Sequence, residues 1–342
     1  MDKEPLSRVR LIVRPDYVDA ANDHLDGMNV DRARVILLSG DVVSIDLGLS
    51  GREYLDLVEN VTDVYHVASI WYLGVDRRQT HEVNVRGARN VIDACDEMKR
   101  LNRLNHFSTA FVAGDRKGVI LEEELELEQS FRNAYEETKY EAEQLMRTAM
   151  DHLPVSVFRP SIIVGDSTTG EIDKFSGPYY LMYAIVHMPS NVPMLMPGKG
   201  DKPLNLVPID YVCDAMHMIS CRNDTAGQTF HLTDPNPLAA RHVFARIAKY
   251  VGKPTPIRGI PYRLTRLVMK FPYLEKTMRA PRQFMEDFNQ LTIYNAMNTA
   301  KALDGQLSCP SLPDYLERLV DYINTTEANL DMDWPLDVDI LG

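Results

Sequence analysis

The stretch Tyr135-Glu136-Glu137-Thr138-Lys139 decides how the rest of this sequence is interpreted. It lies within residues 134–150, a segment with the residue pattern of a helix. Residues four positions apart share one face of a helix, so this spacing places the ammonium of Lys139 beside the phenol of Tyr135. A free phenol has a pKa of about 10, and a neighbouring cation favours its ionised form. The pair therefore predicts an acid that acts on a carbonyl oxygen, although the same spacing arises by chance in many helices.

This helix lies between two apolar segments. Upstream, Phe107-Ser108-Thr109-Ala110-Phe111-Val112 has the β-branched and aromatic residues of a strand that ends with a hydroxyl. Downstream, residues 155–165 form a second apolar segment, which Pro160 and Gly165 interrupt. A strand, a helix and a strand in this order predict a βαβ unit in a parallel sheet.

With Thr109, Tyr135 and Lys139 in this order, the chain resembles the extended short-chain dehydrogenase/reductase family. Members of that family use a Ser or Thr, a Tyr and a Lys together over a nicotinamide cofactor. The resemblance implies that these three residues are catalytic and that Ser108 borders the cofactor. It also implies that Asn84 holds a water molecule between the lysine and solvent. The alternative for Asn84 is a polar residue near the start of a helix.

The composition is that of a protein that can bury a full core. The chain has 342 residues, 45% of them hydrophobic, and a formal net charge of -12 at pH 7. This charge argues against binding to a phosphate backbone, so we expect no nucleic-acid partner. Four widely spaced cysteines without metal-ligand spacing are expected in the core of a protein in a reducing cytosol, and no metal site is expected; they are Cys95, Cys213, Cys221 and Cys309.

No signal segment or membrane span is expected from the sequence. No apolar run reaches the length of about eighteen residues that a transmembrane helix needs, and no cationic start precedes an apolar core. A cytoplasmic location is therefore expected.

Three segments near the start of the chain predict strands. They are residues 8–14, 34–39 and 63–68, and a short helical connection follows the first at Pro15. The resemblance places Asp41 and Val42, after the second strand, against the adenine of the cofactor, and Ala68, after the third, beside its phosphate and ribose. Further along the chain, the resemblance adds Pro160 and Ile163 to the cofactor site. Such strand ends meet at the carboxyl edge of a parallel sheet.

Arg14 closes the first of these strands. Where a strand end reaches the adenosine ribose, an acidic residue suits NAD and an arginine accommodates the additional phosphate of NADP. Arg14 therefore favours NADPH over NADH. A surface arginine next to a proline is the alternative.

The glycine-rich turn of a dinucleotide-binding fold is missing from this sequence. The first glycine is Gly27, and residues 1–26 offer no G-x-G-x-x-G turn. In a sheet of order 3-2-1-4-5-6 the strand before that turn is central, so its loss removes hydrogen bonds from two neighbours and the amides that hold the pyrophosphate. A start codon placed too late, a shortened chain or a relic that no longer binds cofactor would each explain this, and the intact remaining motifs favour the first. We expect the chain as given to bind NADPH poorly.

Residues 159–178 favour an acyl substrate. Arg-Pro-Ser-Ile at 159–162 is followed by Gly170, Ile172-Asp173 and Gly177-Pro178, a spacing that resembles fatty acyl reductases and thioester reductase domains. The run after it is rich in Met and Tyr, from Tyr179 to Met196. Such a run is typical of a buried core, and the alternative is a groove for an acyl chain.

The second half of the chain predicts two returning strands and a mainly helical end. Residues 204–211 and 229–234 predict strands that join the main sheet, with a helix from about 207 to 220 between them. Residues 258–282 contain seven basic side chains and one acidic one, which would suit CoA phosphates, an acidic carrier protein or peripheral contact with a membrane. A solvated face is the alternative. The acidic residues 122–128 predict a solvated connection, and the tail after 324 is also acidic.

The sequence therefore predicts an α/β fold with a Rossmann-like doubly wound parallel sheet, without its first strand and glycine-rich turn, and a smaller, mainly helical substrate lobe. Residues 1–166 would form an NADP-binding domain to which 204–235 returns, and 167–203 with 236–342 would form the lobe. The expected function is NADPH-dependent reduction of an acyl thioester, carried by CoA or an acyl carrier protein, to an aldehyde or alcohol. The alternatives are a sugar-nucleotide epimerase or dehydratase, a hydroxysteroid-type dehydrogenase, and a non-catalytic relic or cofactor-sensing relative.

Overall fold

The structure is a computed structural model that describes residues 7–28, 30–71, 75–187, 189, 195–197, 200–255, 257–260 and 291–326, with only the backbone of 195–197 and 257–260. Several sequence predictions lie outside the described side chains. They are the expected acyl groove at Met188 and from 190 to 196, the basic segment 258–282 and the acidic tail after residue 326.

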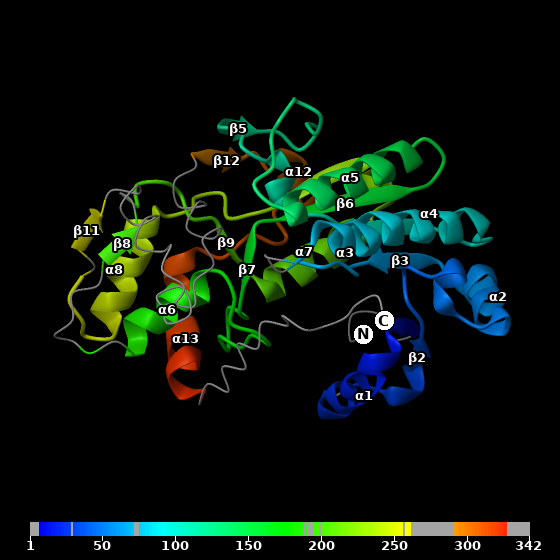
Figure 1. The fold of residues 1–342 in the computed structure, drawn as a ribbon, viewed down its shortest axis with the longest axis horizontal. Helices are drawn as coiled ribbons and strands as arrows, with labels where there is room; N and C mark the ends of the chain where they lie inside the picture. The colour runs from blue at the N-terminus through cyan, green and yellow to red at the C-terminus, as the bar shows by residue number, and fades with distance from the viewer. Residues whose placement is uncertain are drawn as a thin grey trace.

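The main sheet has four parallel strands in the order β10-β6-β4-β3. They are β3 (Asp63–His66), β4 (Arg103–Phe107), β6 (Val155–Pro160) and β10 (Gln228–Leu232). Helices α4 (Gly87–Glu97) and α5 (Ala134–Ala149) cover one face, and α7 (Ile209–Ser220) covers the other (Figure 1). Strands β4 and β6 are almost entirely buried, as expected for parallel strands with helices on both faces.

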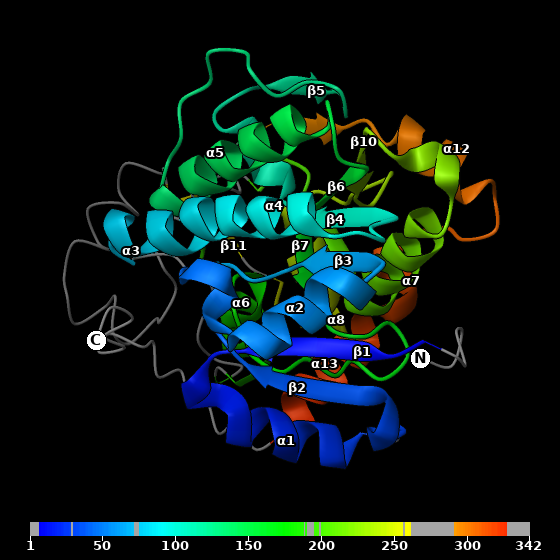
Figure 2. The same ribbon diagram turned by 90° about the vertical axis from the view of Figure 1, so that its right-hand side faces the viewer.

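Strands β1 (Val9–Val13) and β2 (Val35–Ser39) form a separate parallel pair. Within the described residues β1 pairs only with β2, and β3 only with β4. Figure 2 shows β1 on the side of its pair that faces β3. Both strands are incompletely buried, and Tyr65 of β3 is 45% exposed. The central strand of a dinucleotide-binding sheet belongs between two such neighbours, so the division into two sheets agrees with the missing first strand inferred from the sequence.

The connections around the main sheet are short helices and a small strand pair. They are η1 (Pro15–Tyr17), α1 (Val18–Gly27), η2 (Arg32–Arg34), η3 (Ile45–Gly48), α2 (Gly51–Asn60), α3 (Arg77–His81), the π-helical turn η4 (Glu82–Arg86), η5 (Ala110–Ala113), η6 (Asn223–Thr225), β5 (Gly118–Ile120), β12 (Thr292–Tyr294) and α12 (Met297–Leu303). Strand β12 pairs with β5 in parallel.

A second group of elements, three helices and four short strands, follows the carboxyl end of β6. It comprises β7 (Ile162–Val164), α6 (Pro178–His187), β8 (Leu195–Pro197), β9 (Leu206–Pro208), α8 (Ala240–Tyr250), β11 (Ile257–Ile260) and α13 (Leu312–Thr325). The buried side chains of Tyr179, Phe244 and Tyr315 join α6, α8 and α13 in one hydrophobic core. The apolar residues of α8 recur at helical spacing on its inner face, which explains why this segment forms a packed helix.

The structure corrects two predicted strands. The segment 107–112 is not a strand, because β4 ends at Phe107 and Thr109 caps η5, its hydroxyl accepting a hydrogen bond from the amide of Phe111. The preference of threonine for such a cap outweighs its preference for strands. Residues 204–211 contain only the short strand β9, which pairs with β7 rather than with the main sheet. Strand β10 does join the main sheet beside β6, as predicted.

The cysteine prediction is correct only in part. Cys95 is 1% exposed and belongs to the core between α4 and the sheet. Cys213 and Cys221 are exposed, because they lie on the outer side and just after the end of α7.

We expect Gly170→Ala to lower the free energy of unfolding by about 2 kcal/mol. Gly170 has a φ of +78°, and a Cβ atom there would lie 2.2 Å from the carbonyl oxygen of Arg318 in α13. Gly51→Ala is the control, since a Cβ atom at Gly51 meets nothing within 4 Å and alanine favours a helix. Urea denaturation measures both variants, and an equal loss in the two would contradict the proposed strain.

Candidate active site

The three residues expected to be catalytic come together at the carboxyl end of β4. Thr109 follows this strand, while Tyr135 and Lys139 lie in the first two turns of α5. Asn133 caps this helix, its side chain accepting a hydrogen bond from the amide of Glu136 at 2.9 Å. The Thr109 hydroxyl interacts with the Tyr135 phenol and lowers its pKa. The cap therefore sets the helix start that delivers the phenol to the threonine.

Burial governs the protonation of this group. Burial raises the pKa of Tyr135 to about 12, against the hydrogen bond with Thr109, which lowers it. The lowering of the Tyr135 pKa that we expected from Lys139 is therefore wrong for this structure. The physical reason is that the Lys139 ammonium donates a hydrogen bond to the carbonyl oxygen of Phe107, at the end of β4. Burial also lowers the pKa of Lys139 to about 8, against the attraction of Glu143.

A buried carboxylate lies next to the pair on the same helix. Glu143 is fully buried and accepts hydrogen bonds from the Ser108 hydroxyl at 2.6 Å and from Arg159 Nη2 at 2.6 Å. Burial raises the pKa of Glu143, but Arg159, Arg147 and Ser108 together hold it below its ordinary value. The Ser108 hydroxyl, expected to border the cofactor, thus points to this carboxylate. Its contact with a cofactor stays a prediction.

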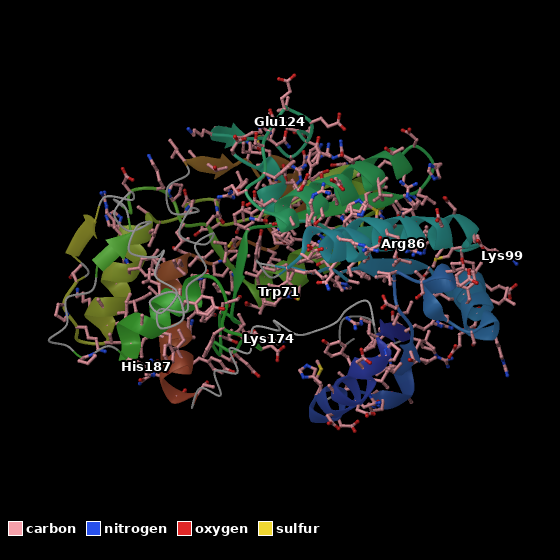
Figure 3. The ribbon with its side chains drawn as sticks, viewed as in Figure 1. Trp71, Arg86, Lys99, Glu124, Lys174 and His187 are labelled. Carbon is pink, nitrogen blue, oxygen red and sulfur yellow. The ribbon has the colours of Figure 1, made fainter. Side chains whose placement is uncertain are left out.

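Glu122 corrects the prediction of a solvated acidic connection. It is 1% exposed, and its carboxylate accepts hydrogen bonds from the amides of His231 at 2.8 Å and Asn298 at 2.6 Å. The amide of Asn298 lies at the start of α12, where backbone N–H groups lack partners within the helix. An acceptor is needed there, so one glutamate of the acidic run is buried. Its neighbour Glu124 lies beside β5 (Figure 3).

The residues expected near the adenosine follow the ends of three strands. Arg14, after β1, lies 3.7 Å from the carboxylate of Asp41, which follows β2. Asp41 also accepts a hydrogen bond from the amide of Val43, and the carbonyl oxygen of Val42 accepts one from Asn90 of α4 at 2.7 Å. Ala68, after β3, is exposed. Arg14 and Asp41 are thus neighbours, as residues that meet one adenosine should be.

Asn84 is buried in the π-helical turn η4. Its side-chain oxygen accepts a hydrogen bond from the amide of Ile70 at 2.7 Å. Its amide nitrogen donates to the carbonyl oxygen of Ile70 and to the Thr138 hydroxyl, both at 3.0 Å. The side chain therefore ties the loop after β3 to α5. The water-holding role of Asn84 stays a prediction, although π-helical turns occur often at functional sites.

The last two expected cofactor residues lie where β6 and β7 meet. Pro160 is the last residue of β6 and is buried, and Ile163 in β7 is half-buried. Ile163 packs against the core formed by α7, β10 and α12. Their contact with a cofactor stays a prediction.

Two buried histidines escaped the sequence analysis. His66 of β3 and His106 of β4 are register partners, and their Nδ1 atoms lie 3.1 Å apart. Within the described structure, the Nε2 atom of each ring lacks a hydrogen-bond partner. Burial lowers the pKa of His66 to about 3, and the charge of Lys139 adds to this lowering. The two residues are 40 positions apart, so only the pairing of the strands brings them together.

A basic cavity lies on the outer side of α8. It has a volume of about 540 Å³ and is lined by Leu238, His242, Ala245, Arg246, Lys249, Lys253 and Thr255. Among the described residues of this lining, none is acidic. Among the described residues, no His, Cys, Asp and Glu side chains gather into a metal-binding group, and none of the helices described combines the length and apolar character needed to cross a bilayer.

Residues 2–216 match the model of an NAD-binding family described as Male sterility protein. Over 213 residues the chain is 28% identical to the fatty acyl-CoA reductase wat of Drosophila melanogaster, an alignment that covers 54% of this chain and 41% of that reductase. The chain thus spans less than half the length of this relative.

Solved structures share the fold. The terminal R domain from the myxalamid PKS-NRPS biosynthetic pathway is 26% identical, with a TM-score of 0.76 over 92% of this chain and 83% of that domain. UDP-glucuronic acid 4-epimerase from Bacillus cereus, solved with NAD, is 18% identical, with a TM-score of 0.65 over 94% of this chain and 92% of the epimerase. The second likeness concerns the fold alone.

Three buried histidines predict that acid destabilises the protein. Burial lowers the pKa of His66 and of His231 to about 3, and that of His106 well below its usual value. As the pH falls below about 6.5, these residues bind protons in the unfolded chain but not in the folded one, so the free energy of unfolding decreases. Urea denaturation between about pH 7 and pH 5 measures this slope.

We expect His66→Gln to reduce this slope. An unaltered slope in the His66 variant would show that acid sensitivity comes from other groups.

Proposed function

Because the chain belongs to the Male sterility protein family of extended short-chain dehydrogenase/reductases, we propose that it reduces an acyl thioester with NADPH. The observation that carries this proposal is that the Thr109 hydroxyl and the Tyr135 phenol come together at the end of β4, one helical turn from Lys139. Two hydroxyl donors that meet at one point suit a single carbonyl oxygen on which negative charge develops. The family and the relatives named above support a nicotinamide cofactor.

The residues present fit one end of such a cofactor better than its middle. The ammonium of Lys139 in α5 reaches the end of β4, where it would bind the ribose hydroxyls next to the nicotinamide. Arg14, which donates a hydrogen bond to Asp16 at 3.1 Å and lies 3.7 Å from Asp41, would turn to the adenosine phosphate of NADPH. Within the described residues, no strand is hydrogen-bonded to both β1 and β3, so none is placed to lead into a pyrophosphate turn. When bound, the cofactor supplies the hydride.

The protein supplies the proton and holds the oxygen. The raised pKa of Tyr135 keeps the phenol protonated at neutral pH, so it can donate its proton to the oxygen as the carbonyl carbon is reduced. The Thr109 hydroxyl donates a hydrogen bond to the same oxygen. The product of this step is a hemithioacetal. Its collapse breaks the carbon–sulfur bond and releases a thiol and an aldehyde, which a second hydride would convert to an alcohol.

The thioester would be carried by CoA or by the phosphopantetheine arm of a carrier protein. Both carriers are negatively charged, and the described lining of the cavity on α8 offers His242, Arg246 and Lys249 with no acidic side chain beside them. The fatty acyl-CoA reductase of Drosophila and the PKS-NRPS R domain support a thioester as the common substrate class. The sugar-nucleotide alternative has support from the fold alone, because the epimerase is 18% identical.

We expect Tyr135→Phe to lower the rate of NADPH oxidation with acyl-CoA by a factor of about 10² to 10⁴, the usual contribution of a general acid. Tyr140→Phe is the control, because Tyr140 lies on the same helix, where its hydroxyl accepts a hydrogen bond from Gln144. The assay uses millimolar NADPH and acyl-CoA of several chain lengths. If the Tyr135 variant keeps the unmodified rate, the proposed chemistry is wrong.

Calorimetric titration tests the cofactor site. We expect a dissociation constant for NADPH weaker than micromolar, because residues 1–26 provide no glycine turn. Arg14→Ala should weaken NADPH binding further while leaving NADH binding unchanged. Arg10→Ala is the control, since Arg10 in β1 pairs with Asp56 at 2.7 Å. Micromolar binding by the unmodified chain, or equal losses for both cofactors, would contradict this account.

A further inference from the structure

Three consecutive residues at the end of β4 each interact with α5. The Phe107 carbonyl accepts a hydrogen bond from Lys139, the Ser108 hydroxyl donates to Glu143 at 2.6 Å, and the Thr109 hydroxyl meets Tyr135. The three helix residues are spaced by four positions and share one face. The relative position of the expected catalytic groups therefore depends on all three contacts between the end of β4 and α5.

Glu143 is the centre of a buried charge cluster. It is fully buried, and its carboxylate accepts hydrogen bonds from Ser108 Oγ at 2.6 Å, Arg159 Nη2 at 2.6 Å, Arg159 Nε at 3.0 Å and Arg147 Nε at 3.0 Å. A buried ion pair contributes little net stability, because its desolvation cost offsets its attraction. The cluster is therefore better explained by the geometry that it imposes than by stability.

The charge cluster around Glu143 fixes the positions of Ser108 and Thr109. The Ser108 amide donates to the carbonyl oxygen of Phe158 in β6 at 2.7 Å, and its hydroxyl is held by Glu143. Because the amide and the hydroxyl of Ser108 are both held, the position of the Cα atom of Thr109 is restricted. Thr109 then turns out of the strand to cap η5.

We propose that Glu143 is the positioning residue of this site, holding Ser108 so that the Thr109 hydroxyl meets the Tyr135 phenol, and placing a negative charge one helical turn from the Lys139 ammonium. This proposal rests on the proposed function for its purpose, but its structural and electrostatic consequences do not depend on the substrate.

The charge of Glu143 acts on Lys139 with few competitors. Among the described residues, the other titratable groups that face Lys139 are Tyr135 on its own helix, His66 from β3 and His106 from β4. All three are neutral, because burial raises the pKa of the phenol and lowers the pKa values of the two rings. Within the described structure, Glu143 is the anion that raises the pKa of Lys139, against the burial that lowers it to about 8. Arg147 and Arg159 face Glu143 and keep it ionised. Removal of the Glu143 charge should therefore lower the pKa of Lys139 further.

Glu143→Gln tests the electrostatic part of the proposal. The pKa of Lys139 is measured by NMR titration of protein labelled with carbon-13 at lysine Cε, with its signal assigned from Lys139→Arg. We expect the pKa to fall by about one unit or more. Glu122→Gln is the matched control, because Glu122 is an equally buried carboxylate whose partners are His231, Asn298 and Thr299. We expect it to lower stability without moving the Lys139 titration.

Ser108→Ala tests whether Glu143 positions Thr109 through Ser108. It provides this test even if the Glu143 variant fails to fold. It keeps the charge of Glu143, so the Lys139 titration should stay unchanged. The methyl NMR signal of Thr109, assigned from Thr109→Ser, should shift, and kcat for acyl-CoA should fall about tenfold or more at an unchanged KM. Glu122→Gln should leave the Thr109 signal in place.

The proposal is overturned if Glu143→Gln leaves the Lys139 titration unchanged, or if Ser108→Ala leaves the Thr109 signal unchanged. It is also overturned if Glu122→Gln produces the same shifts, since the effects would then reflect general loosening of the buried cluster. The NMR measurements need no thioester. A failure of the proposed function would appear only in the kinetic assay.

Discussion

The structure depends on how the end of β4 is held against α5. Lys139 donates a hydrogen bond to the Phe107 carbonyl, Glu143 accepts one from the Ser108 hydroxyl, and Tyr135 interacts with the Thr109 hydroxyl. The register of the sheet transmits this constraint, because Phe158 in the neighbouring strand β6 accepts the Ser108 amide. A rigid strand end opposite a rigid helix face is the kind of support that a catalytic group needs to keep a productive geometry.

Burial sets the electrostatics of this region. Tyr135 is kept as a neutral phenol, His66 and His106 as neutral rings, and Lys139 is brought to a pKa of about 8. The charges that remain are grouped, with Glu143 between two arginines and Glu122 on backbone amides. A site with few mobile charges lets a bound cofactor and substrate dominate the local field, since attraction is stronger where water is excluded.

The expected catalytic groups and the residues expected to bind the adenosine belong to two separate sheets. The expected catalytic groups lie on the four-stranded sheet, whereas Arg14 and Asp41 follow the separate pair β1-β2. In a dinucleotide-binding fold one strand and its glycine turn join these two parts and carry the pyrophosphate. Within the described residues, the half-exposed strands β1 and β3 bound the place where that strand would lie.

The sequence by itself determined the elements that follow from short-range patterns. The helix around Tyr135 and Lys139, the order of strand, helix and strand, and the return of β10 could all be read from spacing and composition. Only the tertiary structure decided which partners the polar and charged side chains have and which of them are buried. The hydrogen bond from Lys139 to Phe107, the His66–His106 contact and the burial of Glu122 join residues that are 32, 40 and more than 100 positions apart. Such contacts depend on strand register and on which polar groups lose water, and local residue patterns do not encode either.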